Sequence, residues 1–357
     1  MSVLVKNLGD LFKLILQAFN LSSIFPALVF VTVFHIFLFP ILQEHLLQDY
    51  SSSAPAQILA TLLFVTLVAY FLDAINYTLI RFLEGYNFPK INLVTETKRG
   101  YVTEIKEIVA EIEDLAMQLR PKVTQDPKGE AAELFDKILK IRDEQVQQIS
   151  NSFPYHTEFI LPTQFGNVIR AAELYPRKLF GIDAVVLWPF LQPTLTDVGY
   201  SQNLLREKAM LDLLINLQAV VVLFTALLIP VEILTTDLTF NLIVGLILKV
   251  SGLLLIAVLL YRLSIDSAAS WGYTIRTAFI LYKDKLREAL NLQKPTSYES
   301  EKKLWELASL FFDAYELTEK EQIQYAKQIF NPDGYAKLLL TEIGRGHVPK
   351  SHEETKA

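Results

Sequence analysis

The chain has 357 residues, of which 52% are hydrophobic, and a formal net charge of −6. Soluble domains are usually about 45–50% apolar, so the composition indicates a protein with additional apolar surface. The acidic balance, with basic and acidic residues interleaved, argues against a nucleic-acid-binding surface. Because the chain has no cysteine, disulfides, iron–sulfur clusters, thiolate zinc sites and cysteine nucleophiles are all excluded.

The chain begins with an amphipathic segment, which we assign to residues 1–21. Within residues 3–19 the large apolar side chains recur on one helical face, at Leu4, Leu8, Leu11, Phe12, Ile15, Leu16 and Phe19. This spacing predicts a helix that either lies in the interface of the inner leaflet or packs on a cytosolic domain. The segment lacks a compact apolar region with a small-residue cleavage site, so we expect no cleavable signal peptide.

Four apolar windows predict helices that cross a membrane. They are Ser22–Leu42, Ile58–Leu72 (whose apolar pattern continues to Ile80), Leu213–Val231 and Phe240–Tyr261. The first three windows carry no formal charge, and the last contains only Lys249. Since roughly 20 helical residues cross the hydrocarbon core of a bilayer, we predict an all-α membrane protein with four transmembrane helices.

The distribution of lysine and arginine predicts the orientation. Two basic residues precede the first span, 16 lie in residues 81–212 and 14 follow from residue 262, whereas residues 43–57 and 232–239 have none. Short loops without basic residues face the outside, so the positive-inside rule predicts that both termini are cytoplasmic. The expected location is therefore the plasma membrane, with most of the chain in the cytosol.

The first two spans are predicted to occupy residues 22–84, with Gly85 ending the second helix. A cytosolic helix is expected over Thr95–Leu119, ending before Pro121. Its apolar residues are spaced by three and four, as in a heptad seam, at Ile105, Ile108, Ile112, Leu115 and Leu119.

Residues 121–129 are rich in turn formers, and a second helix is predicted from Glu130 to Ile149. Two helices of this length with a short connection predict an antiparallel hairpin. We favour packing of the seam within the chain, and pairing between subunits is the alternative.

Residues 150–195 are rich in proline, and with the hairpin they form a predicted cytosolic region over residues 85–195. One short helix is expected over Asn167–Tyr175, capped by Asn167 and ended by Pro176. The following segment, GIDAVVLWPFLQPTL (181–195), is almost wholly apolar, but Pro189 and Pro193 are expected to prevent one helix from running through it. It is predicted to be buried where the long helices leave the membrane. The alternative is that it dips into the inner leaflet, with Trp188 at headgroup level.

Residues 196–292 are predicted to contain the third and fourth spans with cytosolic extensions. The third helix is expected to run without interruption from Thr196, and the fourth from Phe240 to Leu292. Residues 293–345 carry two further predicted helices, Glu299–Leu317 and Thr318–Phe330, and the second begins with a capping-box pattern. The last residues, 346–357, are polar and are predicted to be disordered.

One segment resembles a known group of sequences. LPTQFGNVIRAAELYPRKLFGIDAVVLWP (161–189), together with LIRFLEGY (79–86), is similar to a segment of bacterial multi-span membrane proteins that have no assigned activity. The resemblance covers about a tenth of the chain and implies a bacterial inner membrane. It implies no catalytic residue and no ligand.

The sequence has no motif for a common enzymatic or nucleotide-binding site. Phosphate-binding loops, dinucleotide-binding glycine motifs, nucleophile elbows and zinc-protease motifs are all absent, and the five histidines lack metal-ligand spacing. We therefore predict no catalytic residues, no metal and no cofactor, and we expect the protein not to be an enzyme.

The candidate functional residues are instead polar side chains at membrane depth, where they are energetically costly. They are Lys249, His35, Asp73, Asn76, Asn241 and Arg262. Lys249 and His35 lie at similar depth, about 13 Å and 10 Å from the outer ends of their spans. Together these residues could line a polar path. Alternatively they lock helices together, with Lys249 near Glu232 or Asp237 and Asp73 paired with Arg262.

Two functional hypotheses follow. The first is a homo-oligomeric ion channel gated by its cytosolic helices, because four helices from one chain are few to enclose a pore. The second is a membrane-anchored scaffold or sensor that docks a cytosolic protein through the hairpin. The expected partners are the lipid bilayer, further copies of the chain and a cytosolic protein, with no nucleic acid.

Overall fold

The computed structural model describes residues 21–41, 54–86, 92–235, 239–313, 318–332 and 334. These residues are overwhelmingly helical, and none of them forms a strand. The predictions for the amphipathic segment before Leu21 and for the tail 346–357 lie outside the described residues. The chain divides into two compact units. The first consists of residues 1–169 and 204–271, and the second of residues 170–203 and 272–357.

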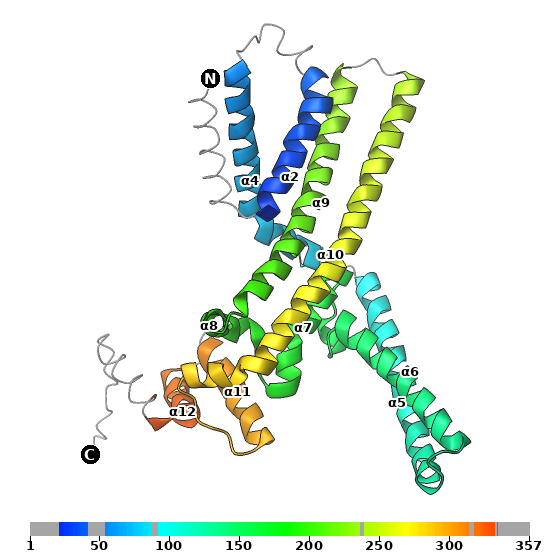
Figure 1. Ribbon diagram of the computed structural model, residues 1–357, viewed down its shortest axis with the longest axis vertical. Coiled ribbons are helices and arrows are strands. Elements are labelled where there is room, and N and C mark those ends of the chain that lie inside the picture. The colour runs from blue at the N-terminus through cyan, green and yellow to red at the C-terminus, as the bar shows by residue number, and fades with distance from the viewer. Residues whose placement is uncertain are drawn as a thin grey trace, which may run out of the picture. The chain divides into compact units, whose positions relative to one another are not determined.

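Four helices are long and apolar enough to cross a membrane, which agrees with the four predicted spans (Figure 1). The first runs through α2 (Leu21–Val33) and a π-helical turn, η1 (Phe34–Leu38). The others are α4 (Ala54–Glu84), α9 (Ser201–Thr235) and α10 (Phe240–Ala289). Long apolar helices of this kind suggest a membrane protein.

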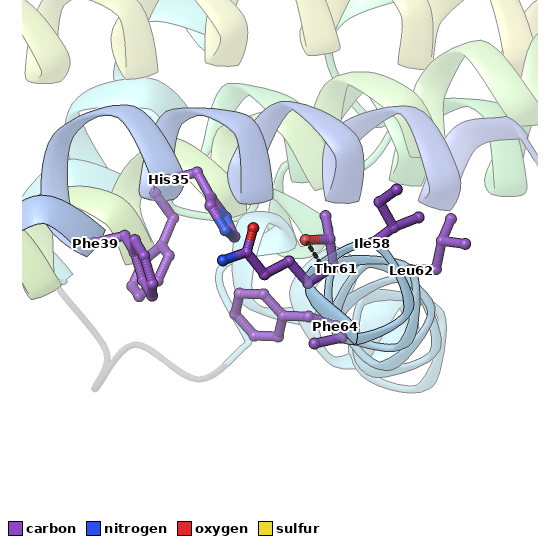
Figure 2. Close-up of a pocket in the computed structure, with 9 residues that line it drawn as sticks. His35, Phe39, Ile58, Thr61, Leu62 and Phe64 are labelled. Atoms are coloured by element: carbon purple, nitrogen blue, oxygen red, sulfur yellow. Dashed lines mark hydrogen bonds between the residues drawn. The ribbon is translucent and has the colours of Figure 1, made fainter. Parts of the chain in front are cut away.

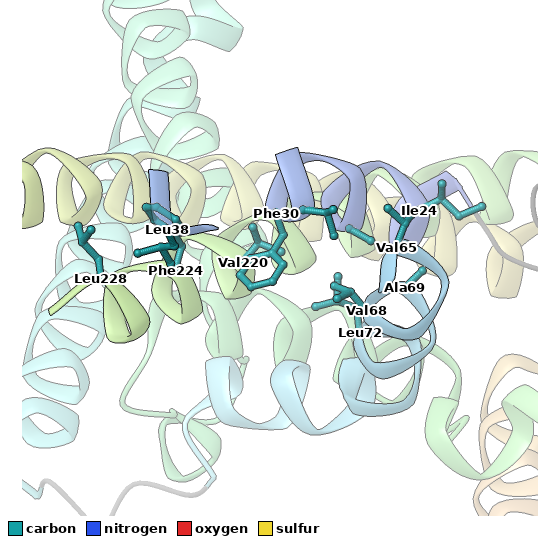
Figure 3. Packing of buried hydrophobic residues seen from close by; sticks show 12 residues of the cluster. Ile24, Phe30, Leu38, Val65, Val68, Ala69, Leu72, Val220, Phe224 and Leu228 are labelled. Carbon is teal, nitrogen blue, oxygen red and sulfur yellow. The ribbon is translucent and has the colours of Figure 1, made fainter. Parts of the chain in front are cut away.

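Three of these helices form the apolar core of the first unit. Side chains of α2, α4 and α9 interdigitate in one buried cluster that includes Phe30, Leu72 and Phe224 (Figure 3). By contrast, α10 contributes to this cluster only the partly buried Leu253. Only 6% of its apolar window is buried, against 22–33% for the other three spans. The apolar surface of α10 is therefore available to lipid or to another protein.

A second cluster lies where the ends of the spans meet the start of α7 (Gln164–Phe180). Phe165 and Ile169 of α7 are buried against Leu211 and Ile215 of α9 and Ala268 of α10. The small side chain of Ala268 thus permits a close approach of α10 to α7 and α9.

The hairpin region consists of α5 (Asn92–Gln125) and α6 (Glu130–Ser152), which pack side by side (Figure 1). At its base Val102 and Ile105 are buried against Ile149 and Phe153. The prediction that the first helix ends before Pro121 is wrong. A proline removes only its own N–H donor, and the helix continues beyond it, with the Asp126 N–H bound to the Lys122 carbonyl at 3.0 Å.

Asn167 does not cap a helix as predicted, because α7 already begins at Gln164. Its side chain is fully buried and holds the preceding loop. The Nδ2 group donates to the carbonyls of Leu161 and Thr163, at 2.9 Å and 2.8 Å, and Oδ1 accepts the Leu161 N–H at 2.7 Å. We call this arrangement the Asn167 clip.

The Asn167 clip also fixes the end of α4. Thr163 Oγ1 donates to the Glu84 carbonyl at 2.9 Å and accepts the Gly166 N–H at 3.0 Å. Gly166 lies so close to Glu84 that a Cβ atom there would be 2.2 Å from its carbonyl oxygen. The end of the helix at Glu84, predicted from Gly85, is confirmed. The loop satisfies a terminal carbonyl that has no partner within the helix.

The second unit contains the end of α7, α8 (Ala184–Asp197), the end of α10, α11 (Tyr298–Asp313) and α12 (Glu319–Ile329). The predictions that Pro176 ends a helix and that Pro189 and Pro193 break one are wrong, since α7 and α8 run through them. A bend of 86° separates the two helices. Gly181, with φ of 78°, lies in this bend and packs against the Lys302 carbonyl, so that only glycine fits there.

Burial on one face explains how α8 tolerates two prolines. Leu187, Leu191 and Leu195 recur every four residues and are all fully buried. The Asp183 side chain caps the helix by accepting the N–H groups of Val185 and Val186. The apolar segment 181–195 is thus buried in protein along its leucine face.

Aromatic contacts join α8 to the rest of the second unit. Phe190 packs on Phe312 of α11 with ring centroids 4.7 Å apart, and Trp188 lies 6.1 Å from Phe279 of α10. The predicted uninterrupted helix from Thr196 is wrong, because α8 ends at Asp197 and α9 begins only at Ser201.

The C-terminal helices follow the sequence pattern closely. The capping box is confirmed at Thr318 and Glu321. Hydrogen bonds from the Thr318 hydroxyl and N–H stabilise the carboxylate and lower the pKa of Glu321 below its ordinary value.

We expect Asn167→Ala to lower the free energy of unfolding by about 2 kcal/mol, because it leaves buried backbone groups of Leu161 and Thr163 without partners. Thermal unfolding in detergent measures this loss, and protease cleavage within residues 153–163 should become faster. The matched control is Asn203→Ala at an exposed position. Equal unfolding midpoints for both variants would contradict the role of the clip.

Candidate functional site

The first unit contains two groups of polar contacts between its apolar helices. One group, the inner polar cluster, consists of Ser22, Ser23, Asp73, Asn76 and Asn216. Asn216 of α9 is fully buried and donates to the Ser22 carbonyl of α2 at 3.0 Å. Its Oδ1 accepts from Asn76 Nδ2 of α4 at 3.3 Å, and Ser23 Oγ donates to Asp73 Oδ1 at 3.4 Å. The cluster therefore joins α2, α4 and α9.

The second group is an ion pair between Lys249 of α10 and Glu232 of α9. The Glu232 side chain is only 9% exposed, whereas the Lys249 side chain is 54% exposed. The pair joins the two helices near the short loop that connects them. Of the two partners considered from the sequence, the structure therefore selects Glu232. The ion pair would weaken the anion preference that Lys249 could give to a pore.

His35 lies apart from both groups, in the π-helical turn η1. It borders a cavity of about 610 Å³ between the first span and α4. Its ring stacks on Phe39 with centroids 4.9 Å apart, and both side chains point toward α4 (Figure 2). The other lining residues are mostly apolar, with Gln57 and Thr61 as polar exceptions. His35 and Lys249 therefore have different surroundings despite their similar predicted depth.

The remaining candidates make no such contacts. Asn241 and Arg262 are exposed on α10, and within the described part of the chain no hydrogen bond or ion pair joins them to another residue. The pairing of Asp73 with Arg262 considered from the sequence is not observed. The structure thus brings together Asp73 and Asn76 through the inner polar cluster, but it does not assemble the six residues into one site.

Metal chemistry receives no support from the described residues. Among them, no group of three or more histidine, aspartate or glutamate side chains is placed to hold a metal ion.

Outside the spans, three basic side chains fasten α5 to the loop before α7. Lys98 and Lys106 donate to the carbonyls of Pro162 and Tyr155, each at 2.6 Å, and Arg99 Nε donates to the Thr157 carbonyl at 3.0 Å. Burial lowers the pKa of the Lys98 ammonium below its ordinary value. The base of the hairpin is therefore fixed to the same loop that the Asn167 clip holds.

The hairpin exposes apolar side chains from its base outward. Five of them are 43–50% exposed, and we call them the apolar strip: Tyr101, Ile108 and Leu115 on α5, and Leu134 and Ile141 on α6. Met117 and Val146 are also exposed but belong to other faces of the two helices. Apolar side chains in this number are unusual on helices that are otherwise densely charged, and such patches are typical of protein–protein contacts.

Sequence reasoning missed several residues of these sites. Asn216, Ser22 and Ser23 lie at the ends of apolar windows, where single polar residues are common, so their contacts depend on three-dimensional packing. Two members of the apolar strip, Ile108 and Leu115, were predicted to belong to the internal seam, because they fit its three- and four-residue spacing. In the structure both are exposed, and the inward positions are the residues that follow them, Val109 and Ala116.

Comparison with protein-family models, with curated proteins and with solved structures gives no match for the chain. Functional inference therefore depends on the contacts and exposed surfaces described above.

We expect Lys249→Met to lower the free energy of unfolding by about 1–2 kcal/mol, because it leaves the buried Glu232 carboxylate without its partner. The double variant Lys249→Met/Glu232→Gln should recover most of this loss. Thermal unfolding of all four forms in the same detergent gives the coupling between the two residues. Additive losses would show that the ion pair does not hold α9 to α10.

Proposed function

We propose that the protein is a non-enzymatic, membrane-anchored docking protein, in which the four spans are the anchor and the helical hairpin recruits another protein. The observation that carries this proposal is the apolar strip. Its five side chains remain exposed on a helix pair that carries 12 acidic and nine basic residues over 92–152. Apolar side chains along helices are suited to binding other helices.

The polar contacts between the spans support the anchoring role. Polar residues in a membrane are costly, and pairing them across helices reduces that cost. Asn76 and Asn216 bind each other, and Lys249 binds Glu232, so these side chains are already used to hold one chain together. A water-filled polar path would need such groups to face a common space.

We propose the orientation of the spans from the distribution of basic residues along the chain. Both short loops lack basic residues, so the hairpin and both termini are placed in the cytoplasm. The resemblance of residues 161–189 to bacterial membrane proteins supports an inner-membrane location. In this arrangement the Asn167 clip fixes an antiparallel hairpin on the cytosolic side, at the end of the second span.

Site-specific photo-crosslinking in living cells tests the docking role. A photoreactive amino acid at Leu115 should give discrete adducts with a bound protein, because this side chain belongs to the apolar strip. The matched control is the same amino acid at Glu113, which is exposed and lies on the opposite flank of α5. We expect adducts at position 115 to exceed those at 113 by about tenfold, as for a buried interface residue compared with a surface residue.

Adducts of equal intensity at both positions, or none at either, would reject docking through the hairpin. Deletion of residues 101–149 should also abolish co-purification of the bound protein while leaving the spans inserted.

A second candidate function is the homo-oligomeric ion channel. The observation that favours it is the exposure of α10, whose apolar window is the least buried of the four spans and which carries the half-exposed Lys249. Subunits that met along α10 would place this charge near a shared axis.

Recordings in planar bilayers test the channel directly. If α10 lines a pore, Lys249→Glu should reverse the ion preference of the current from anions to cations. Lys249→Met provides the uncharged control. Absence of current from the purified wild-type protein, or identical selectivity in all three forms, would exclude a pore formed by this residue.

A further inference from the structure

The two helices of the hairpin carry more apolar positions than their mutual contact needs. In α5 the positions that face α6 follow a seven-residue repeat, at Val102, Ile105, Val109, Ile112, Ala116 and Leu119, and each is buried or partly buried. In α6 the corresponding inward positions are Phe135, Ile138, Arg142, Gln145 and Ile149. These are the a and d positions of a two-helix seam.

The apolar strip is a third line of the same repeat. Tyr101, Ile108 and Leu115 each precede a buried a position of α5, and Leu134 and Ile141 each precede an a position of α6. All five are therefore g positions. In an antiparallel helix pair the g positions of both helices lie on one flank. The opposite flank of α5 is charged, with Arg99, Lys106, Glu113 and Arg120 at the e positions.

Helices with apolar residues at a, d and g are typical of bundles in which each helix has two neighbours. Among the described residues, α5 and α6 each have one helical neighbour along the distal part of the hairpin. The pattern therefore predicts two further helices on the flank that carries the apolar strip. One more hairpin supplies these two helices.

We propose that this flank binds the same flank of a second copy of the chain, forming a four-helix bundle. The proposal rests on the docking role proposed above and identifies the partner. A two-fold axis makes the contact isologous, so each copy buries the same apolar strip. The strip suits such a contact because its five members are all apolar, with no unpaired charge among them.

The net charge of the hairpin argues against a lipid surface as the binding partner of the apolar strip. Residues 92–152 carry 12 acidic and nine basic side chains, a net charge of −3. The cytoplasmic leaflet is itself anionic and attracts basic segments. A hairpin with this charge is repelled from that surface, whereas the apolar strip can pack against the helices of another protein.

Membrane insertion determines how the two copies meet. Two copies in one bilayer are related by an axis normal to it, so their hairpins run in the same direction. Then α5 of one copy lies against α6 of the other, as neighbouring antiparallel helices of a bundle do. Because Ile105 packs at the level of Ile149, Leu115 lies at about the level of Ile141. Leu115 of one copy therefore faces Ile141 of the second.

Because the chain has no cysteine, only cysteines introduced by substitution can form disulfides between copies. Leu115→Cys and Ile141→Cys are made in separate, differently tagged chains, expressed together and oxidised in native membranes. The control pair is Glu113→Cys with Asp143→Cys, which are exposed and lie on the opposite side of their helices from the strip. We expect at least about tenfold more mixed covalent dimer from the first pair, since only nearby side chains form disulfides.

A second measurement does not depend on cysteine. The mass of the detergent-purified protein should correspond to two chains of 40.7 kDa. The double variant Leu115→Lys/Ile141→Lys should run as one chain while keeping its helical circular dichroism, and Glu113→Lys/Asp143→Lys should remain dimeric.

Equal cross-linking of the two cysteine pairs, or a wild-type protein that is monomeric in both detergent and nanodiscs, would overturn the proposal. The photo-crosslinking experiment separates this failure from failure of docking itself. Discrete adducts at position 115 with a different protein, and none of twice the chain mass, would retain the docking role and reject the second copy. Absence of any specific adduct would reject both.

Discussion

The arrangement of the first unit depends on one buried amide. The side chain of Asn167 makes three hydrogen bonds to backbone groups of Leu161 and Thr163, and it has no access to water that could replace them. The loop held in this way caps the end of α4 and receives the basic side chains of α5. An apolar helix long enough to cross a membrane and the hairpin are thereby fixed to the same few residues. This gives a physical role to the LPTQFGN segment, residues 161–167.

The energetics of the apolar environment explain the polar contacts of the spans. Asn216 has no water partner inside the helix bundle, and its amide therefore bonds to both α2 and α4. Lys249 is long enough to reach Glu232 while half of its side chain remains exposed. These contacts hold α2, α4, α9 and α10 together by specific pairing, which non-directional packing of leucine and phenylalanine alone cannot provide.

Apolar windows and periodicity predicted the four spans, the end of α4 at Glu84 and the capping box at Thr318, because each depends on residues close in sequence. The predictions at the prolines were wrong for the opposite reason, because the structure there depends on residues that are far apart in sequence. Tertiary burial of Leu187, Leu191 and Leu195 stabilises α8 through two prolines, and local propensity contains no information about that burial. For the same reason, the partner of Lys249 was limited to two candidates, while the role of Asn216 was missed.

The seven-residue spacing of the exposed side chains on α5 also restricts how the length of this helix can change. Inserting or deleting one residue between Tyr101 and Leu115 turns everything beyond it by about 100° around the helix axis. Ile108 and Leu115 would then no longer share a flank with Ile141, although composition and helix content would hardly differ. Natural relatives that keep this surface should accordingly differ in hairpin length by whole heptads, with matching changes in both helices.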